Sequence, residues 1–417
     1  MSVPRILLLA GAPPVYGGGG KIFLHDLCLY YPRESLCCFA VCPNNRDSLP
    51  QDLDWLPIAY GSRPREAISY GLRLRELGFQ RLVRGIAHPI SFLMWQYAKV
   101  QIRALIAQAV RFGKQHGVDM VWAVLDSPTL IYMAKRVTSA LGAQLVTSVL
   151  DPPEYFLSMN SCLDRISRRS LLREFEKVMR ASVRCGVISE EMQSEYEKEY
   201  GVESVIMRHG IHPNRRKPPA KEPTGEKQFV IGFAGSLYAA REWRALLSAL
   251  SKLDWRIDGL DITVLVVGNY ADFLLQDKAH IKYLGWRSIE ETIDLMSEVD
   301  VTYLPYWFDE SYRMAVRLCF PTKLTTYLAS GRPVLFHGPE DSSPASFFRR
   351  FPVGLCCHSL EESRIIECLY QFATDKEFYA AATDAGQAAL EQELDLRVFL
   401  RRFATLIGID EGELLPI

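Results

Sequence analysis

The stretch FPTKLTTYLASGRPVLF, residues 320–336, decides how this chain folds. Pro321 leads a turn into a short helix, and Gly331 stops that helix, because glycine adopts the left-handed conformation that ends helices without steric cost. Pro333 follows the stop, and the apolar residues 334–336 begin a buried strand. A helix that begins near the carboxyl end of a parallel sheet can bind phosphate. The stretch therefore predicts an α/β fold with an anion site.

Length and composition narrow the class of protein. At 417 residues the chain exceeds one ordinary hydrophobic core, which predicts two domains. Its 48 Lys and Arg against 49 Asp and Glu leave a net charge of −1, so nucleic-acid binding is not expected. The 10 cysteines are irregularly spaced and form no Cys-x-x-Cys pair, so we expect reduced, buried thiols. No apolar run approaches the roughly twenty residues of a membrane-spanning helix, and we expect a cytoplasmic protein.

Short apolar runs alternate with helical patterns along both halves of the chain, as in parallel sheets covered by helices on both faces. We expect a Rossmann-like domain at 1–213 and a linker at 214–227, which is rich in proline and charge. A second Rossmann-like domain follows at 228–392, and a terminal helix at 393–417 crosses back to the first domain. The predicted fold class is α/β, with two doubly wound domains that face each other across a cleft.

The alternation also predicts the individual elements. Strands are expected at 5–11, 36–42, 120–125, 144–150, 184–188 and 204–208, then at 229–234, 262–267, 280–284, 301–304, 333–336 and 354–357. Helices are expected at 21–30, 90–116, 129–140, 167–181 and 190–200, then at 241–252, 289–298, 322–329, 361–373, 376–391 and 395–406. The segment 307–320 is expected to be one loop.

Four consecutive glycines, residues 17–20, separate the first expected strand from the first helix. The P-loop pattern fails there, because Val15 and Ile22 stand where it needs a glycine and a Ser or Thr. Ile22 also replaces the third glycine of the dinucleotide fingerprint. The bare backbone of Gly18 and Gly19 can still approach a phosphate or a sugar, and a purely structural turn is the alternative.

Several segments resemble the nucleotide-sugar glycosyltransferases with two Rossmann domains (GT-B), especially the retaining family 4. The opening stretch is similar to that family's Pro-x-Lys-Leu-aromatic-Glu-Tyr-Leu-Ala-small-Gly-basic-Pro-Val signature. The segment Phe-Ala-Gly-Ser-Leu-Tyr at 233–238 is similar to its Gly-Arg/Ser-Leu loop, and Arg241 stands where the family has a cation that grips the donor diphosphate. The resemblance implies an acceptor-binding first domain and a second domain that binds a nucleoside-diphosphate sugar.

The resemblance also implies which residues bind the donor. Arg241 and Lys323 would neutralise the leaving diphosphate, helped by the amides around 322–324, so neither a metal nor a cofactor is expected. Trp286 either stacks on the base or packs between strand and helix. The donor-binding residues implied are Gly18, Gly19, Gly235, Ser236, Arg241, Gly285, Trp286, Thr322, Lys323, Leu324 and Thr326.

The chain departs from the family at two acidic positions. Family members place two glutamates seven residues apart in sequence, and this chain has Leu318 and Thr326 there. In the family the second glutamate holds the ribose hydroxyls, whereas Thr326 offers one neutral hydrogen bond. Glu310 or Asp309, from the preceding loop, is the candidate for a replacement carboxylate.

Two aspartates of the first half end predicted strands. Asp126 and Asp151 are candidates for the catalytic base or for an acceptor ligand, with loop capping as the alternative for both. In the family a histidine precedes the position of Asp151, and Leu150 stands there in this chain.

A basic stretch at 70–114 holds eight Lys or Arg against one acidic residue, Glu76, with aromatic and aliphatic residues between them. Such a surface suits an anionic membrane that carries a lipid-linked acceptor. A core-packing helix with a basic solvent face is the alternative.

The expected function is the transfer of a sugar from a nucleoside-diphosphate sugar to a glycan or lipid-linked acceptor. The resemblance implies retention at the anomeric carbon, in the synthesis of cell-surface polysaccharide or glycoconjugates, at the inner face of the membrane. A sugar-nucleotide epimerase of the same fold is one alternative. The other is a degenerate, non-catalytic binding partner, because Ser236, Leu150, Leu318 and Thr326 replace residues that the family uses.

Overall fold

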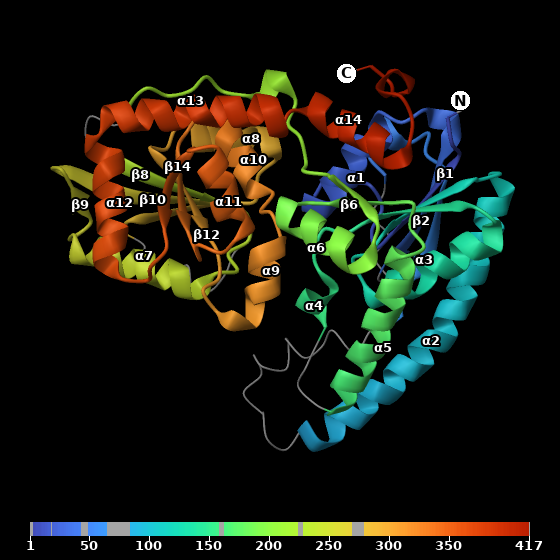
Figure 1. Ribbon diagram of the computed structural model, residues 1–417. Coiled ribbons are helices and arrows are strands. Elements are labelled where there is room, and N and C mark those ends of the chain that lie inside the picture. The colour runs from blue at the N-terminus through green and yellow to red at the C-terminus, as the bar shows by residue number, and fades with distance from the viewer. Residues whose placement is uncertain are drawn as a thin grey trace. The chain divides into compact units, whose positions relative to one another are not determined.

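A computed structural model gives the fold and describes residues 3–17, 19–42, 49–64, 84–157, 162–223, 228–268 and 279–416. The chain divides into two compact units (Figure 1). Unit 1 comprises Met1–Met207 and Leu400–Ile417, and unit 2 comprises Arg208–Phe399. The chain thus leaves unit 1 once and returns to it within the helix α14, Leu396–Ile407.

Unit 1 is built on a parallel sheet with the strand order β3-β2-β1-β4-β5-β6-β7. From β1 the chain first adds β2 and β3 on one side and then β4 to β7 on the other. The switch point of this sheet therefore lies between β1 and β4, which is where ligands bind in open α/β sheets. The strands are β1 Ile6–Ala10, β2 Leu36–Cys42, β3 Ile58–Ser62, β4 Met120–Val124, β5 Gln144–Ser148, β6 Arg184–Val187 and β7 Glu203–Ile206.

Helices connect these strands, and their ends follow from local sequence. In α3, Ser127 caps the N-terminus by accepting a hydrogen bond from the Leu130 amide, and Gly142 ends the helix in the left-handed conformation at φ +66°. In the same way, Ser189 caps the N-terminus of α6 and Gly201 ends that helix in the left-handed conformation. The helices of unit 1 are α1 Gly19–Leu29, α2 Arg84–Gln115, α3 Pro128–Leu141, α4 Pro153–Phe156, α5 Cys162–Met179 and α6 Glu190–Tyr200, with short 3-10 turns at Arg33–Ser35, Gln51–Leu53 and Glu411–Glu413.

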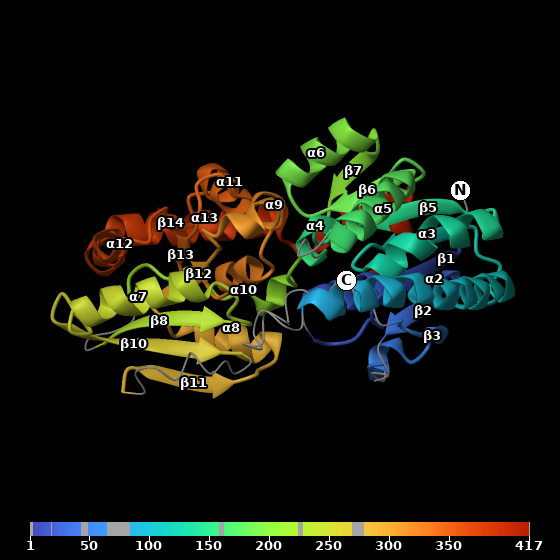
Figure 2. The ribbon, with the colours of Figure 1, turned by 90° about the horizontal axis from the view of Figure 1, so that it is seen from below.

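Unit 2 repeats this plan with the order β11-β10-β8-β12-β13-β14, and the short strand β9 pairs antiparallel with β10. Figure 2 shows these parallel strands spread side by side. The switch point lies between β8 and β12. The strands are β8 Gln228–Ala234, β9 Arg256–Ile257, β10 Leu260–Val267, β11 Ile281–Gly285, β12 Val301–Pro305, β13 Val334–His337 and β14 Gly354–Cys357.

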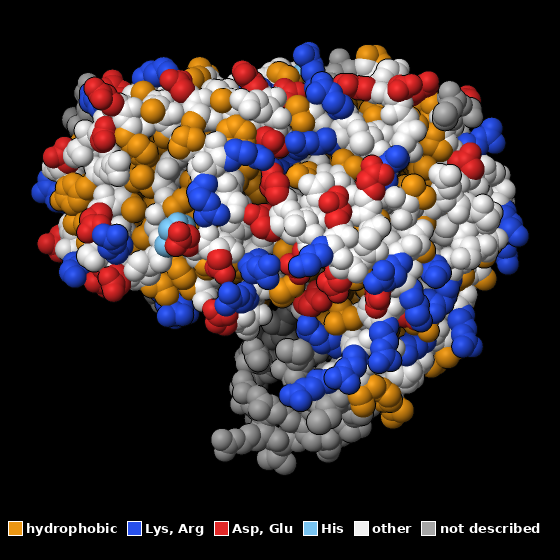
Figure 3. All heavy atoms as spheres, in the orientation of Figure 1, with side chains coloured by type: hydrophobic (Ala, Val, Ile, Leu, Met, Phe, Trp, Pro, Cys, Tyr) orange, Lys and Arg blue, Asp and Glu red, His pale blue; other side chains and the backbone are white. Residues whose placement is uncertain are grey.

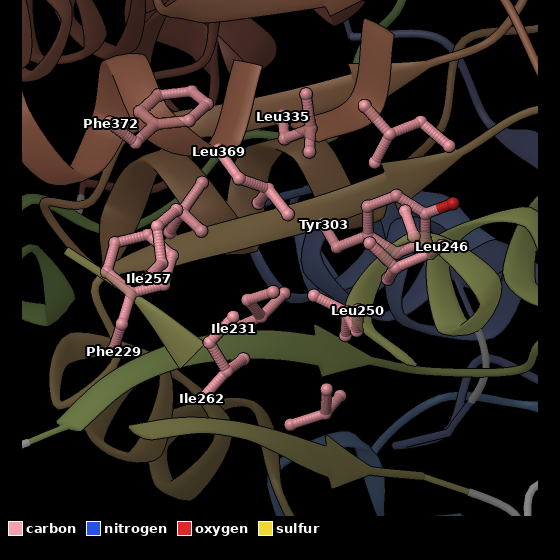
Figure 4. Close-up of a cluster of buried hydrophobic side chains, with 14 of the residues drawn as sticks. Phe229, Ile231, Leu246, Leu250, Ile257, Ile262, Tyr303, Leu335, Leu369 and Phe372 are labelled. Atoms are coloured by element: carbon pink, nitrogen blue, oxygen red, sulfur yellow. The ribbon is translucent and has the colours of Figure 1, made fainter. Parts of the chain in front are cut away.

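The helices of unit 2 cover both faces of its sheet, with α7 and α13 on opposite sides of the strands in Figure 1. They are α7 Ala240–Lys252, α8 Ile289–Ser297, α9 Arg313–Leu318, α10 Lys323–Ala329, α11 Ser343–Arg350, α12 Glu362–Thr374 and α13 Lys376–Glu393, with 3-10 turns at Pro213–Arg215 and Glu310–Tyr312. One core cluster joins sheet and helices: Phe229 and Ile231 of β8 pack with Leu246 and Leu250 of α7, four residues apart on one helical face, and with Tyr303 of β12 (Figure 4).

The stretch that opened the sequence analysis folds as predicted. The amide of Leu324 donates to the carbonyl of Pro321 in the entry turn, α10 follows, and Gly331 ends it at φ +72°. Gly331 is required for a second reason, since a Cβ at this position would lie 2.2 Å from the carbonyl oxygen of Pro218. The strand β13 then begins at Val334.

Other element predictions were wrong or incomplete. The segment 307–320, expected as one loop, contains the 3-10 turn Glu310–Tyr312 and the helix α9. Besides α9, four further strands and helices had no counterpart in the prediction: β3, β9, α4 and α11. Three of them have five residues or fewer and leave little periodicity to detect. The fourth, α11, begins with a serine cap at Ser342 and a proline at Pro344, which is a recognisable helix start that the prediction did not use.

Candidate functional site

Three glycines lie at the carboxyl ends of neighbouring strands in unit 2, and we call them the glycine corner: Gly235, Gly268 and Gly285. All three have positive φ, at +91°, +146° and +74°. The amide of Gly235 donates to the carbonyl of Val267 at 2.8 Å, and the amide of Gly268 donates to that of Gly285 at 2.9 Å. A Cβ on Gly268 would lie 2.4 Å from the carbonyl oxygen of Gly235. Close packing thus excludes any side chain at Gly268, and the positive φ favours glycine at all three positions, which leaves bare backbone at the sheet edge.

Lys323 reaches this corner from the first turn of α10. Its Nζ donates a hydrogen bond to the carbonyl of Ser236 at 2.8 Å, and it lies 4.4 Å and 4.5 Å from the ring centroids of Phe233 and Tyr238. No carboxylate lies within 4.0 Å of this ammonium among the residues that the structure describes. Burial against the two rings lowers the pKa of Lys323 to about 7. The ammonium therefore has donors to spare and lacks a negative partner.

Tyr327 fixes the position of that lysine. Its hydroxyl accepts a hydrogen bond from the amide of Ala234 at 2.8 Å and donates one to the carbonyl of Ala234 at 3.3 Å. Because Tyr327 follows Lys323 by four residues, both side chains project from the same face of α10. Burial raises the pKa of the phenol, which keeps it protonated. The helix is thus pinned to the end of β8, immediately before the glycine corner.

An aromatic row borders the lysine: Tyr238, Trp307 and Tyr312. The rings of Tyr238 and Trp307 have centroids 4.5 Å apart, and those of Trp307 and Tyr312 are stacked at 4.6 Å with an interplanar angle of 12°. The indole nitrogen of Trp307 donates to the carbonyl of Tyr238 at 3.1 Å. The row joins the loop after β8 to the loop after β12, the two loops that flank the switch point.

Several of the donor-binding residues implied by the resemblance leave polar groups unused. Within the described ranges, the hydroxyls of Ser236, Thr322 and Thr326 and the guanidinium of Arg241 make no hydrogen bond or ion pair. Arg241 is exposed in the first turn of α7. Trp286, next to Gly285, is 63% exposed. Of the amides around 322–324 that were expected to help bind the diphosphate, that of Leu324 already donates to the carbonyl of Pro321.

The acidic candidate in unit 2 belongs to a separate cluster. Glu310 is exposed and pairs with Arg313 at 3.2 Å, and Arg313 also bonds to Asp341 at 3.3 Å. Asp309 caps the 3-10 turn by accepting from the amide of Ser311 at 2.8 Å. Leu318, at the first of the two family glutamate positions, is buried in the core. In this state no ion pair joins Glu310 to Lys323.

The predicted acidic residues of unit 1 lie at its sheet edge. Asp126 follows β4, beside the switch point, and its carboxylate packs on Gly11, where a Cβ would lie 2.5 Å from Oδ2. Asp151 follows the adjacent strand β5 and is exposed. Gly19 begins α1, and Gly18 lies outside the described residues.

A histidine of unit 1 lies between two carboxylates, an arrangement that the sequence analysis missed. The Nδ1 of His25 is 2.9 Å from Asp26, and its Nε2 is 3.1 Å from Asp52. The hydroxyl of Tyr16, in the loop before the glycines, donates to Asp52 at 2.6 Å. Burial alone would lower the pKa of His25, but the hydrogen bonds and charges of Asp26 and Asp52 outweigh it, so the pKa is raised. We call these residues the His25 cluster.

The described part of the chain shows neither a metal-binding cluster nor a membrane-spanning helix. Among the residues that the structure describes, no group of three or more His, Cys, Asp or Glu is arranged to hold a metal ion. Among the described helices, none combines the length and the apolar character needed to cross a bilayer.

Residues 228–340, within unit 2, match the family model described as "Glycosyl transferases group 1". No curated protein sequence matches the chain. Solved structures match it over nearly its whole length. HepE of Anabaena, in complex with UDP and glucose, has 15% identity and a TM-score of 0.66, covering 97% of this chain and 99% of that chain. The α,α-trehalose 6-phosphate synthase of Burkholderia multivorans has 12% identity and a TM-score of 0.64, with 97% and 98% covered.

Sucrose-phosphate synthase of Thermosynechococcus elongatus matches to the same extent, with 11% identity, a TM-score of 0.64 and 97% and 98% covered. At these identities the similarity establishes the fold. The predicted pair of doubly wound parallel-sheet domains, the GT-B fold, is confirmed. The predicted resemblance to the glycosyltransferases is confirmed for residues 228–340 by the family match.

Proposed function

This chain carries a segment that matches the group 1 glycosyltransferases, within a GT-B fold, and we propose that it is an enzyme. The proposed reaction transfers a sugar from a nucleoside-diphosphate sugar to a glycan or lipid-linked acceptor. The observation that carries this proposal is Lys323, whose ammonium lies at the switch point of unit 2 without a carboxylate partner in the described structure. A partly desolvated cation without a counter-ion is unfavourable, and a diphosphate would supply that counter-ion.

Uridine diphosphate is the donor nucleotide we propose. HepE, one of the structural neighbours, is described in complex with UDP and with UDP-glucose. Beside the glycine corner, the exposed indole of Trp286 offers a flat apolar face on which a base can stack. The hydroxyl of Thr326 has no partner within the described ranges, and we assign it a single hydrogen bond to the ribose in place of the carboxylate that the family uses.

The chemistry we propose needs charge neutralisation at the leaving group. The bond between the anomeric carbon and the diphosphate oxygen breaks, and the acceptor oxygen forms its bond on the same face, with retention. The proton of the acceptor hydroxyl passes to the leaving phosphate. Lys323 and Arg241 stabilise the negative charge that develops there, which is the largest catalytic contribution expected in such a site. We propose no metal ion and no cofactor for this step.

We propose that Asp126 and Asp151 bind the acceptor or act on it as the catalytic base. Both lie at the carboxyl edge of the unit 1 sheet, where ligands of open α/β sheets bind, and carboxylates suit sugar hydroxyls as hydrogen-bond acceptors. Glu310 stays a candidate for a contact to the donor sugar. For biological context we propose synthesis of a cell-surface polysaccharide or glycoconjugate, in the cytoplasm at the inner face of the membrane.

A ligand screen tests the donor proposal. Thermal unfolding of the full chain is followed with UDP, GDP and ADP and with the corresponding sugar nucleotides, and UDP and its sugars should raise the midpoint, because they bind only the folded state. No shift with any of these ligands would leave a non-catalytic GT-B protein as the better description. Release of UDP only when an acceptor is present would support transfer, whereas interconversion of the sugar without acceptor would indicate an epimerase.

Arg241 has a matched control on its own helix. Arg244 is also exposed and also lacks an ion pair within the described ranges, one turn further along α7. Arg241→Ala should weaken UDP binding by about tenfold, the effect of one charge-assisted hydrogen bond, and Arg244→Ala should leave it unchanged. Equal UDP affinities of the two variants would show that Arg241 does not contact the donor.

A further inference from the structure

The long helix α2 has two apolar faces, and only one of them is buried in unit 1. Its inner face follows the helical repeat, with Trp95, Ala98, Ile102, Leu105 and Ala109 all buried. On the opposite side Leu93, Tyr97 and Val100 are 65%, 65% and 57% exposed. Their spacing of four and three residues places them in one row along the helix. Packing in the core of unit 1 therefore explains the apolar residues on the inner face of α2, but it does not explain the exposed apolar row on the opposite side.

The neighbouring helix α5, which packs against α2, adds one exposed apolar residue and two exposed arginines. Ile166 is 56% exposed, and Arg169 and Arg173 follow it at spacings of three and seven residues on the same helical face. Nine large hydrophobic residues in the described structure are exposed, and four of them belong to these two helices. Single exposed apolar residues need no explanation, but such a concentration is typical of an interaction surface.

Positive charge surrounds these apolar residues. The helix α2 contains five Lys or Arg and no Asp or Glu. The first twelve residues of α5, 162–173, contain four Arg and one Asp. Figure 3 shows basic side chains gathered along α5 and α2, with hydrophobic side chains beside them. Since the whole chain has a net charge of −1, this local excess of positive charge is a property of the surface and not of the composition.

We propose that this surface binds an anionic lipid bilayer. We call it the α2–α5 face, formed by Leu93, Tyr97, Val100 and Ile166 together with Arg103, Arg169 and Arg173. Apolar side chains that enter the headgroup region, surrounded by arginines that pair with lipid phosphates, are the features of a helix that lies in a membrane interface. A second copy of the chain suits the face less well, because a two-fold contact would bring its arginines against each other. The inference rests on the membrane location proposed above and deepens it, since it names the surface that makes the contact and the class of lipid.

Vesicle co-sedimentation of the full chain tests this face. Vesicles of equimolar phosphatidylcholine and phosphatidylglycerol should pellet the protein, and vesicles of phosphatidylcholine alone should pellet far less of it. Tyr97→Glu should weaken binding to the anionic vesicles at least about tenfold, because it places a carboxylate in the apolar row. Arg169→Gln combined with Arg173→Gln should weaken it roughly twenty-fivefold, from about fivefold for each arginine lost. Tyr370→Glu, at a 41% exposed tyrosine of α12, is the matched control and should bind like the wild type.

Three results would overturn the proposal. One is absence of binding to the anionic vesicles, and another is equal loss of binding in Tyr97→Glu and Tyr370→Glu. The third is a concentration-dependent dimer that Tyr97→Glu dissociates while vesicle binding is absent, which would make the face a contact between copies. UDP affinity is measured on the same preparations. Because the α2–α5 face belongs to unit 1 and the glycine corner to unit 2, Tyr97→Glu should leave that affinity unchanged. The membrane proposal and the donor proposal can therefore fail independently.

Discussion

The switch point of unit 1 carries carboxylates, whereas that of unit 2 carries cations. Both sheets are parallel and doubly wound, and in both the first strand has neighbours added on either side. At the edge of the first sheet lies Asp126, and the His25 cluster combines residues of the loop before α1, of α1 itself and of the 3-10 turn Gln51–Leu53. At the edge of the second lie Lys323 and the glycine corner. One architecture therefore supports two kinds of site, and the loop residues determine which ligand each can hold.

The two sites also differ in how their charges are balanced. In unit 1 the imidazole of His25 is neutralised by two carboxylates of the same unit, so the cluster is complete without a ligand. In unit 2 the ammonium of Lys323 contacts a carbonyl and two rings but no carboxylate of the described structure. The first arrangement is expected to stabilise the fold, and the second to bind an anion.

The largest expected effect is on stability, in unit 1. His25→Ala removes the imidazole that contacts both Asp26 and Asp52, and we expect a loss of about 3 kcal/mol in the free energy of unfolding, at the low end for a broken buried pair because Asp52 is partly exposed. Urea denaturation measures it. UDP affinity should not change, because the contribution of His25 is to the fold of unit 1.

The pH dependence of the stability lost in His25→Ala tests whether the charge of the imidazole is the cause. Because the pKa of His25 is raised in the folded state, its stabilising contribution is fully present below the ordinary histidine pKa of 6.5 and is lost as the pH rises through the folded-state pKa. The difference between wild type and His25→Ala should therefore shrink at alkaline pH. A difference that stays constant with pH would show that packing, and not charge, holds the cluster together.

A smaller effect is expected at the glycine corner. Gly268→Ala brings a methyl group to 2.4 Å from the carbonyl oxygen of Gly235, and we expect a loss of about 2 kcal/mol in unfolding free energy together with weaker UDP binding. Gly259→Ala is the control, because Gly259 also has positive φ but open space around it, so only the backbone strain of about 1 kcal/mol applies. If the two variants unfolded alike and bound UDP alike, close packing at the corner would have no role in the site.

The smallest expected effect concerns the residue that positions Lys323. Tyr327→Phe removes the hydroxyl that pairs with both backbone groups of Ala234, at an expected cost of about 1 kcal/mol in unfolding free energy and a several-fold loss of UDP affinity. Tyr370→Phe, at an exposed site on α12, should change neither quantity. A stability loss with unchanged affinity would mean that α10 holds Lys323 in place without this anchor.

Local signals in the sequence predicted much of the fold. The ranges 36–42, 190–200 and 354–357 were predicted to the residue, because each is a clear apolar run or a capped helix. The end of α10 followed from Gly331 and Pro333 for the same reason. Short elements such as β3 and β9 were not predicted, since a few residues on a sheet edge carry almost no periodic pattern.

Contacts between distant residues were harder to foresee. Gly235 and Gly285 were identified by resemblance, but Gly268 joins them only through the pairing of β10 with its neighbours, which the sequence does not display. Tyr327 lay within the quoted stretch, yet its partner Ala234 is 93 residues away. The His25 cluster likewise brings Asp52 to a histidine 27 residues before it. Such sites depend on topology, and no spacing rule reveals them.

The central claim is that Lys323 supplies the charge that holds a donor diphosphate. Calorimetric titration of UDP into wild type, Lys323→Ala and Lys282→Ala tests it, since Lys282 is an exposed lysine on β11 without an ion pair in the described structure. We predict a loss of about 2 kcal/mol in binding free energy for Lys323→Ala alone. The wild-type affinity should fall as the pH rises above the lysine pKa of about 7, and that dependence should disappear in Lys323→Ala. Equal affinity and equal pH dependence in all three proteins would contradict the claim.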